Sequence, residues 1–107
     1  METQVTLIKN DASTLYIDHP NASYGNFCFN SKGDLFLNSD WGTYGYAWRA
    51  FGDDFVKFIG NSNPDYIVGK FEINYRELTQ KKLPKFREEK VLILVAELIK
   101  YCKEISK

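Results

Sequence analysis

The stretch Ser39–Asp54, SDWGTYGYAWRAFGDD, decides the fold because it joins a hairpin turn, a strand and the start of a helix. Its Asp-Trp-Gly segment is a short link in which glycine supplies the positive φ that a tight hairpin requires. The alternation over 43–49 is typical of a β-strand. Asp53 in the N-cap position, followed by Asp54 in the first turn, then predicts a helix start. The chain therefore changes from β to α structure between residues 49 and 53.

The first half of the chain, residues 1–49, has the pattern of an antiparallel β-meander. Five segments alternate and are separated by turn signals, and they cover residues 4–9, 14–18, 24–30, 34–39 and 43–49. Phe27 and Phe29 share one face of their strand, and Leu35 and Leu37 share one face of theirs. We expect these four side chains to lie in the core.

The second half, residues 53–107, has helical patterns. A first short helix ends at Gly60, and a second begins with Asn63 as its cap and Pro64 at its first position. Residues 85–106 form the strongest helix, whose apolar stripe is Val91, Leu94, Val95, Leu98, Cys102 and Ile105. The prediction is an α+β fold in one domain, residues 1–107. An antiparallel sheet of about five strands packs against the long C-terminal helix, with one or two short helices.

Composition excludes a membrane-spanning protein. No apolar run approaches the roughly 18 residues that a transmembrane helix needs. The N-terminus METQVTLIKND has no basic region followed by a long apolar segment, as a secretory signal would. Cys28 and Cys102 stand alone in apolar surroundings, which is typical of core cysteines in a reducing compartment. We therefore expect a cytoplasmic protein that binds no membrane.

The sequence offers no catalytic residues and no metal or cofactor motif. His19 is the only histidine and has no neighbouring nucleophile, and no Cys/His spacing suggests zinc. No glycine-rich phosphate loop is present. Asp53 and Asp54 are explained by the helix start. We expect a protein that is not an enzyme.

The aromatic strand allows two interpretations. Alternation puts Tyr44, Tyr46 and Trp48 on one face and the small residues Gly45 and Ala47 on the other. In the first interpretation the rings lie in the core against the long helix. In the second the small face packs on the helix, and the rings form an exposed platform of the kind found at binding hot spots. The second defines a candidate partner-binding site made of Trp41, Tyr44, Tyr46, Trp48 and Arg49.

The zero net charge of the chain hides a polarity between its halves. Residues 1–54 carry seven acids and three bases, and residues 55–107 carry seven acids and eleven bases, so the halves are about −4 and +4. Lys81, Lys82, Lys85 and Arg87 are either a solvated surface or contacts for nucleic acid or an acidic protein. The polarity also suits self-association as a homodimer.

From about Gly33 to Phe71 the sequence resembles a group of small uncharacterised proteins from bacteriophages and prophages. The shared pattern comprises Ser39, Asp40, Trp41, Gly42, Tyr44, Tyr46, Trp48, Gly52, Asp54, Phe55, Tyr66 and Lys70. The resemblance implies a phage accessory protein that binds and inhibits a host complex, for example as an anti-CRISPR or another host-defence inhibitor. Its partner would then be a host protein or ribonucleoprotein complex in the host cytoplasm.

The alternative is a small nucleic-acid-binding accessory module. In that module aromatic residues of the sheet stack on bases, while Lys81, Lys82, Lys85 and Arg87 contact phosphates. The four acids interleaved with the bases of residues 70–90 weaken this alternative, because they repel phosphates.

Overall fold

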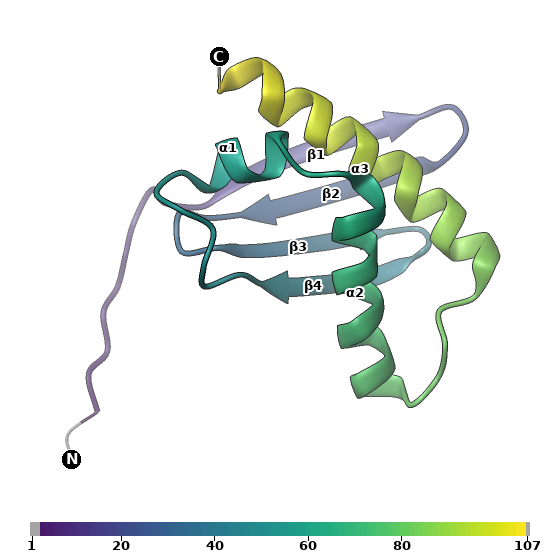
Figure 1. The fold of residues 1–107 in the computed structure, drawn as a ribbon, viewed down its shortest axis with the longest axis horizontal. Helices are drawn as coiled ribbons and strands as arrows, with labels where there is room; N and C mark the ends of the chain where they lie inside the picture. The colour runs from purple at the N-terminus through teal and green to yellow at the C-terminus, as the bar shows by residue number, and fades with distance from the viewer. Residues whose placement is uncertain (1–2, 107) are drawn as a thin grey trace.

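The structure is a computed structural model that describes residues 3–106. The protein folds as one antiparallel sheet with three helices on one of its faces (Figure 1). The strands are β1 (Ser13–His19), β2 (Ser23–Phe29), β3 (Asp34–Ser39) and β4 (Gly42–Ala47), in the order β1-β2-β3-β4. The helices are α1 (Phe55–Gly60), α2 (Pro64–Thr79) and α3 (Lys85–Ile105). The α+β prediction is confirmed, with four strands in place of about five.

The strand predicted over residues 4–9 is the one that does not form. Residues 3–9 have no strand assignment, and the side chains of Val5 and Leu7 are 90% and 79% exposed. A strand needs a neighbouring strand to satisfy its backbone groups, and the alternation of one segment does not supply it. Figure 1 shows this segment leading away from the sheet.

The core lies between the sheet and the helices. Phe27 pairs with Leu37 and Phe29 with Leu35 in the β2–β3 register, and all four side chains are buried as predicted. α3 contributes Val91, Leu94, Val95, Leu98 and Cys102 to this core, also as predicted. Ile105 is exposed, contrary to prediction, because α3 continues beyond its crossing with α1, where Gly60 lies against the backbone of Lys103.

The helix starts follow local capping rules with one correction. The N-cap of α1 is Asp54 and not Asp53, and its carboxylate accepts a hydrogen bond from the Lys57 amide at 3.1 Å. Asn63 caps α2 as predicted, with Pro64 in the first position. α2 is longer than its apolar face suggested. It continues to Thr79, and its last turns include the good helix formers Arg76, Glu77 and Leu78.

Lys90 of α3 fixes the turns at one end of the sheet. Its Nζ donates to the Asn21 carbonyl in the β1–β2 turn at 2.7 Å and lies 5.5 Å from the centre of the Trp41 ring. The Trp41 indole donates to the Ala22 carbonyl at 2.7 Å. These contacts hold the β1–β2 and β3–β4 turns together at this end of the sheet.

Candidate functional site

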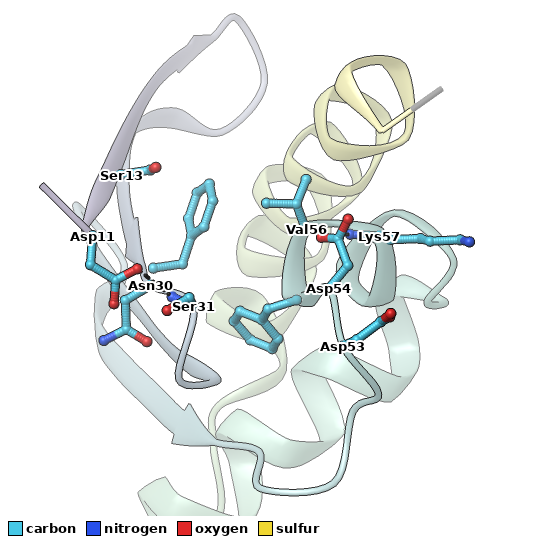
Figure 2. A pocket seen from close by; sticks show the side chains of 10 residues that line it. Asp11, Ser13, Asn30, Ser31, Asp53, Asp54, Val56 and Lys57 are labelled. Carbon is cyan, nitrogen blue, oxygen red and sulfur yellow. Dashed lines mark hydrogen bonds between the residues drawn. The ribbon is translucent and has the colours of Figure 1, made fainter.

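A pocket of about 450 Å³ lies between the β2–β3 turn and the start of α1 (Figure 2). Asp11 and Ser31 border it on the strand side, and Asp53 and Asp54 border it on the helix side. Asp11 and Asp54 are engaged with the backbone amides of Ser31 and Lys57. Within residues 3–106 no group of three or more His, Cys, Asp or Glu side chains is placed to hold a metal ion.

The rings of the aromatic strand face the helices. Tyr44 and Trp48 are only 4% and 6% exposed, and Tyr46 lies on the same side, partly buried. Tyr44 packs with its ring 6.2 Å from that of Phe71 in α2. Tyr44 and Trp48 therefore lie in the core, and the exposed platform is wrong for both. Their ring contacts are with α1 and α2, whereas the core interpretation placed them against the long helix.

Gly45 accommodates a ring of the neighbouring strand β3 and does not pack on a helix. The interpretation that the small face of β4 packs on a helix is wrong, because this face points away from the helices. Gly45 pairs with Phe36 of β3, and a Cβ atom at Gly45 would lie 2.7 Å from the Phe36 ring. The glycine therefore leaves room for the Phe36 ring to lie over the β4 backbone.

Tyr46, Trp48, Tyr66 and Lys70 form one cluster between β4 and α2. The Trp48 indole donates to the Tyr66 hydroxyl at 3.0 Å, and the rings of Tyr46 and Trp48 meet edge to face at 4.9 Å. The ammonium group of Lys70 lies 5.5 Å from the Tyr46 ring centre and 5.6 Å from that of Tyr66. These contacts attach α2 to the sheet, so the cluster has a structural role.

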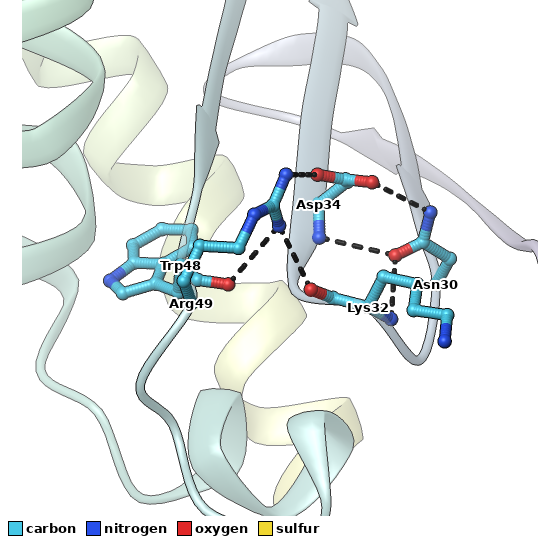
Figure 3. Close-up of polar contacts among 5 residues, drawn as sticks. All are labelled: Asn30, Lys32, Asp34, Trp48 and Arg49. Carbon is cyan, nitrogen blue, oxygen red and sulfur yellow. Dashed lines mark hydrogen bonds and ion pairs between the residues drawn. The ribbon is translucent and has the colours of Figure 1, made fainter. Parts of the chain in front are cut away.

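Arg49 also has a structural role. It pairs with Asp34 at 3.1 Å and donates to the Lys32 carbonyl at 2.9 Å (Figure 3). A hydrogen bond from Asn30, reinforced by Arg49, holds the pKa of Asp34 below its ordinary value despite partial burial. Arg49 thus ties the end of β4 to the β2–β3 turn.

Trp41 lies in the β3–β4 turn and is partly buried. Besides its bond to Ala22 and its contact with Lys90, its carbonyl accepts a hydrogen bond from the Tyr44 hydroxyl. The five candidate partner-binding residues therefore each contact other parts of the fold, and together they do not form one exposed surface.

The four candidate basic residues lie in the helical layer. Lys81, Lys82 and Lys85 are exposed in the α2–α3 connection and at the start of α3, beyond the β4 edge (Figure 1). Arg87 is partly buried near Tyr44, where burial raises the pKa of the Tyr44 phenol and the Arg87 guanidinium opposes that rise. The nucleic-acid alternative requires the exposed bases to share a face with exposed aromatic rings of the sheet. They do not share one.

The sheet surface opposite the helices carries exposed aromatic rings. We call this surface the open face, and it comprises Thr14, Tyr16, Asp18, Tyr24, Asn26, Cys28, Asp34, Phe36, Asn38, Thr43, Gly45 and Ala47. Tyr16 is 64% exposed and Phe36 53%, and the Tyr16 and Tyr24 rings lie 6.0 Å apart. Cys28 lies here, partly buried next to Phe36, and not in the core as expected. Both cysteines are free, and burial raises the pKa of Cys102 to about 11.

Polar groups surround these rings. Asp18 and Asp40 are exposed, and the Asp40 carboxylate accepts a hydrogen bond from the Tyr24 amide at 3.5 Å. Desolvation, with smaller contributions from Tyr16 and Asp40, raises the pKa of Tyr24. The side-chain oxygen of Asn26 is buried without a hydrogen-bond partner in the described structure. A hollow of about 400 Å³ adjoins Phe36 at the β4 edge, where Asn74 of α2 donates to the Gly45 carbonyl at 2.9 Å.

Sequence reasoning missed the open face, although a signal was present. Tyr16 alternates with the partly buried Leu15, and Phe36 alternates with the core residues Leu35 and Leu37. An aromatic ring at a position predicted to face solvent marks a candidate binding surface.

The family Phage_phiTE_072, described as a phage family, has a model that matches residues 5–104. The chain belongs to this phage family. The match extends well beyond the resemblance over Gly33–Phe71 and includes all four strands of the sheet. Neither a curated protein nor a solved structure matches this phage-family chain. Among residues 3–106, no helix has the length and apolar character needed to cross a membrane.

Proposed function

We propose that this phage protein is a binding protein whose open face docks on a basic surface of a host protein and thereby inhibits a host defence or nucleoprotein complex. The observation that carries the proposal is the set of exposed rings, Tyr16, Tyr24 and Phe36, on a sheet face that no helix covers. Exposed aromatic rings set among polar groups are a feature of protein-binding surfaces.

The rings are suited to act as anchors. Fully burying one exposed large apolar side chain contributes about 1.5–3 kcal/mol. Because Tyr16, Phe36 and Tyr24 are 64%, 53% and 40% exposed, docking can gain roughly half of this for each ring. The Phe36 ring lies against the bare backbone of Gly45, in space that a Cβ atom at Gly45 would enter.

Charge favours a basic partner. Residues 1–54, which include the whole sheet, carry a net charge of about −4. The Arg49–Asp34 ion pair leaves this net charge unchanged, and Asp18 and Asp40 are exposed at the open face. Protein surfaces that hold nucleic acid are basic. An acidic, aromatic face would therefore compete with nucleic acid for such a surface, and CRISPR effectors are among the host complexes that have one.

The proposal requires no catalysis. His19, the one candidate acid–base side chain, accepts a hydrogen bond from the Asn21 amide at 3.0 Å through Nδ1, and its Nε2 lies 3.9 Å from Glu97. Both nitrogens are thus directed to structural neighbours in the β1–β2 turn and α3.

Direct binding of single-stranded nucleic acid is the runner-up, because exposed rings on an open sheet are a geometry on which bases stack. The acids at this face repel phosphates, which is why we favour a protein partner. The two functions differ in the effect of nuclease. A protein partner stays bound after nuclease treatment, whereas recovery of a nucleic acid or of its associated proteins is lost.

The charge test compares tagged wild type with Asp18→Lys in capture experiments on nuclease-treated lysate of the bacterial host. Glu77→Lys, an equally large charge change on exposed α2, is the control. We expect Asp18→Lys to weaken capture, Glu77→Lys to preserve it, and added nucleic-acid fragments to displace the captured protein. If neither Asp18→Lys nor added nucleic acid lowers the amount of host protein captured, the proposal is contradicted.

A further inference from the structure

Residues 4–9, which we call the N-terminal arm, have the sequence of a strand but no neighbour. In an extended segment Val5 and Leu7 lie on one face, and Gln4, Thr6 and Ile8 lie on the other. The side chains of Val5 and Leu7 are almost wholly exposed. An exposed segment of this kind gains free energy by pairing with the edge of a sheet.

β1 provides such an edge. Within residues 3–106 it pairs only with β2, so the backbone groups on its other side are open along Ser13–His19. Leu15 and Ile17 lie on the core face of β1 and are only partly buried there. An added strand that placed Val5 and Leu7 on this same face would extend the core over both side chains.

The arm of the same chain is directed away from this edge. The Asp11 carboxylate accepts a hydrogen bond from the Ser31 amide at 3.1 Å, and Ser31 belongs to the β2–β3 turn. That turn lies on the β2 side of β1, opposite the free edge. Figure 1 shows the chain leaving the sheet at this point. Folding the arm back onto its own β1 would require breaking the Asp11 contact.

We propose that the N-terminal arm of each chain pairs with the free β1 edge of a second copy, so that two chains exchange arms in a dimer. This inference goes beyond the proposed function, because it concerns the edge of the sheet and not the rings of the open face. The arm of six residues matches the seven residues of β1. A reciprocal exchange is closed and removes the free β1 edge of both copies at once.

Light scattering of the full chain after size-exclusion chromatography, over a wide range of concentrations, tests the exchange. We expect the wild type to be a dimer and the double variant Val5→Asp/Leu7→Asp to be a monomer. Gln4→Asp/Thr6→Asp is the matched control, since it adds the same charge on the other face of the arm. A monomeric wild type, or a dimer that survives Val5→Asp/Leu7→Asp, overturns the proposal.

Hydrogen exchange of the arm amides separates the two ways in which the arm can pair. Arm exchange predicts amides that are protected in the dimer and lose protection when the protein is diluted to the monomer. Protected arm amides in a monomer indicate a hairpin with the chain's own β1 and also overturn the proposal. Partner capture through Phe36 is measured separately, so failure of the dimer is distinguishable from failure of the proposed function.

Discussion

Phe36 lies directly across the β3–β4 ladder from Gly45, where a Cβ atom would come within 2.7 Å of its ring. This pair explains why a glycine stands in the middle of an aromatic strand. On one side of β4 the rings of Tyr44 and Tyr46 pack toward the helices, and on the other the missing side chain admits a ring from β3. The exposed anchor of the open face thus depends on a residue of the neighbouring strand.

Gly45→Ala is expected to displace the Phe36 ring while leaving the fold intact. The ring is half-exposed and can move, and loss of glycine's freedom in the unfolded chain offsets part of the cost, so we expect a change in stability within about 1 kcal/mol. Partner capture should weaken because the anchor is no longer in position. Unchanged capture, with the Phe36 resonances also unchanged by NMR, would show that the glycine has no such role.

Trp48→Ala is expected to destabilise the protein by about 3–5 kcal/mol, since it empties a large core volume. It also removes the hydrogen bond to Tyr66 and the ring contacts that join β4 to α1 and α2. Phe86→Ala, at a ring 58% exposed on α3, is the control and should change stability by less than about 0.5 kcal/mol. Chemical denaturation measures both. Equal stabilities for Trp48→Ala and wild type would refute the core position of the indole.

Asp34→Asn is expected to lower stability at neutral pH and to lose this effect in acid. Hydrogen bonding from Asn30, together with Arg49, holds the folded pKa of Asp34 below the ordinary 3.8. The ionised form therefore stabilises the fold above pH 3.8, and this contribution is lost as the pH falls through the folded pKa. Urea unfolding of both proteins from pH 7 down to pH values below 3.8 measures the difference. A difference that stays constant over this range would contradict the assignment.

The parts of the fold that follow local rules were predictable from the sequence. Asn63 with Pro64 at the start of α2, and the stripe from Val91 to Cys102 in α3, depend on capping and periodicity within a few residues. The pairs Phe27 with Phe29 and Leu35 with Leu37 were also predictable, since strand alternation fixes which side chains share a face.

The rest depends on contacts between distant segments. Alternation cannot say whether Tyr44 and Trp48 face the helices, because both faces of β4 carry groups that can pack closely. Nor does it say whether residues 4–9 find a neighbouring strand. The direction of this segment depends on the hydrogen bond between the Asp11 carboxylate and the Ser31 amide, which are 20 positions apart in the sequence. The open face was missed for the same reason: Tyr16 and Phe36 become one surface only through the register of β1, β2 and β3.

The central claim is that Phe36 anchors the open face to a host protein. The most direct measurement is capture from nuclease-treated host lysate by tagged wild type, Phe36→Asp and the control Phe86→Asp, whose ring is as exposed as that of Phe36 but lies on α3. All three proteins should show the same thermal unfolding. The account predicts that wild type and Phe86→Asp retain the same nucleic-acid-binding host protein and that Phe36→Asp does not. Equal capture by Phe36→Asp, or no protein retained by the wild type, would contradict it.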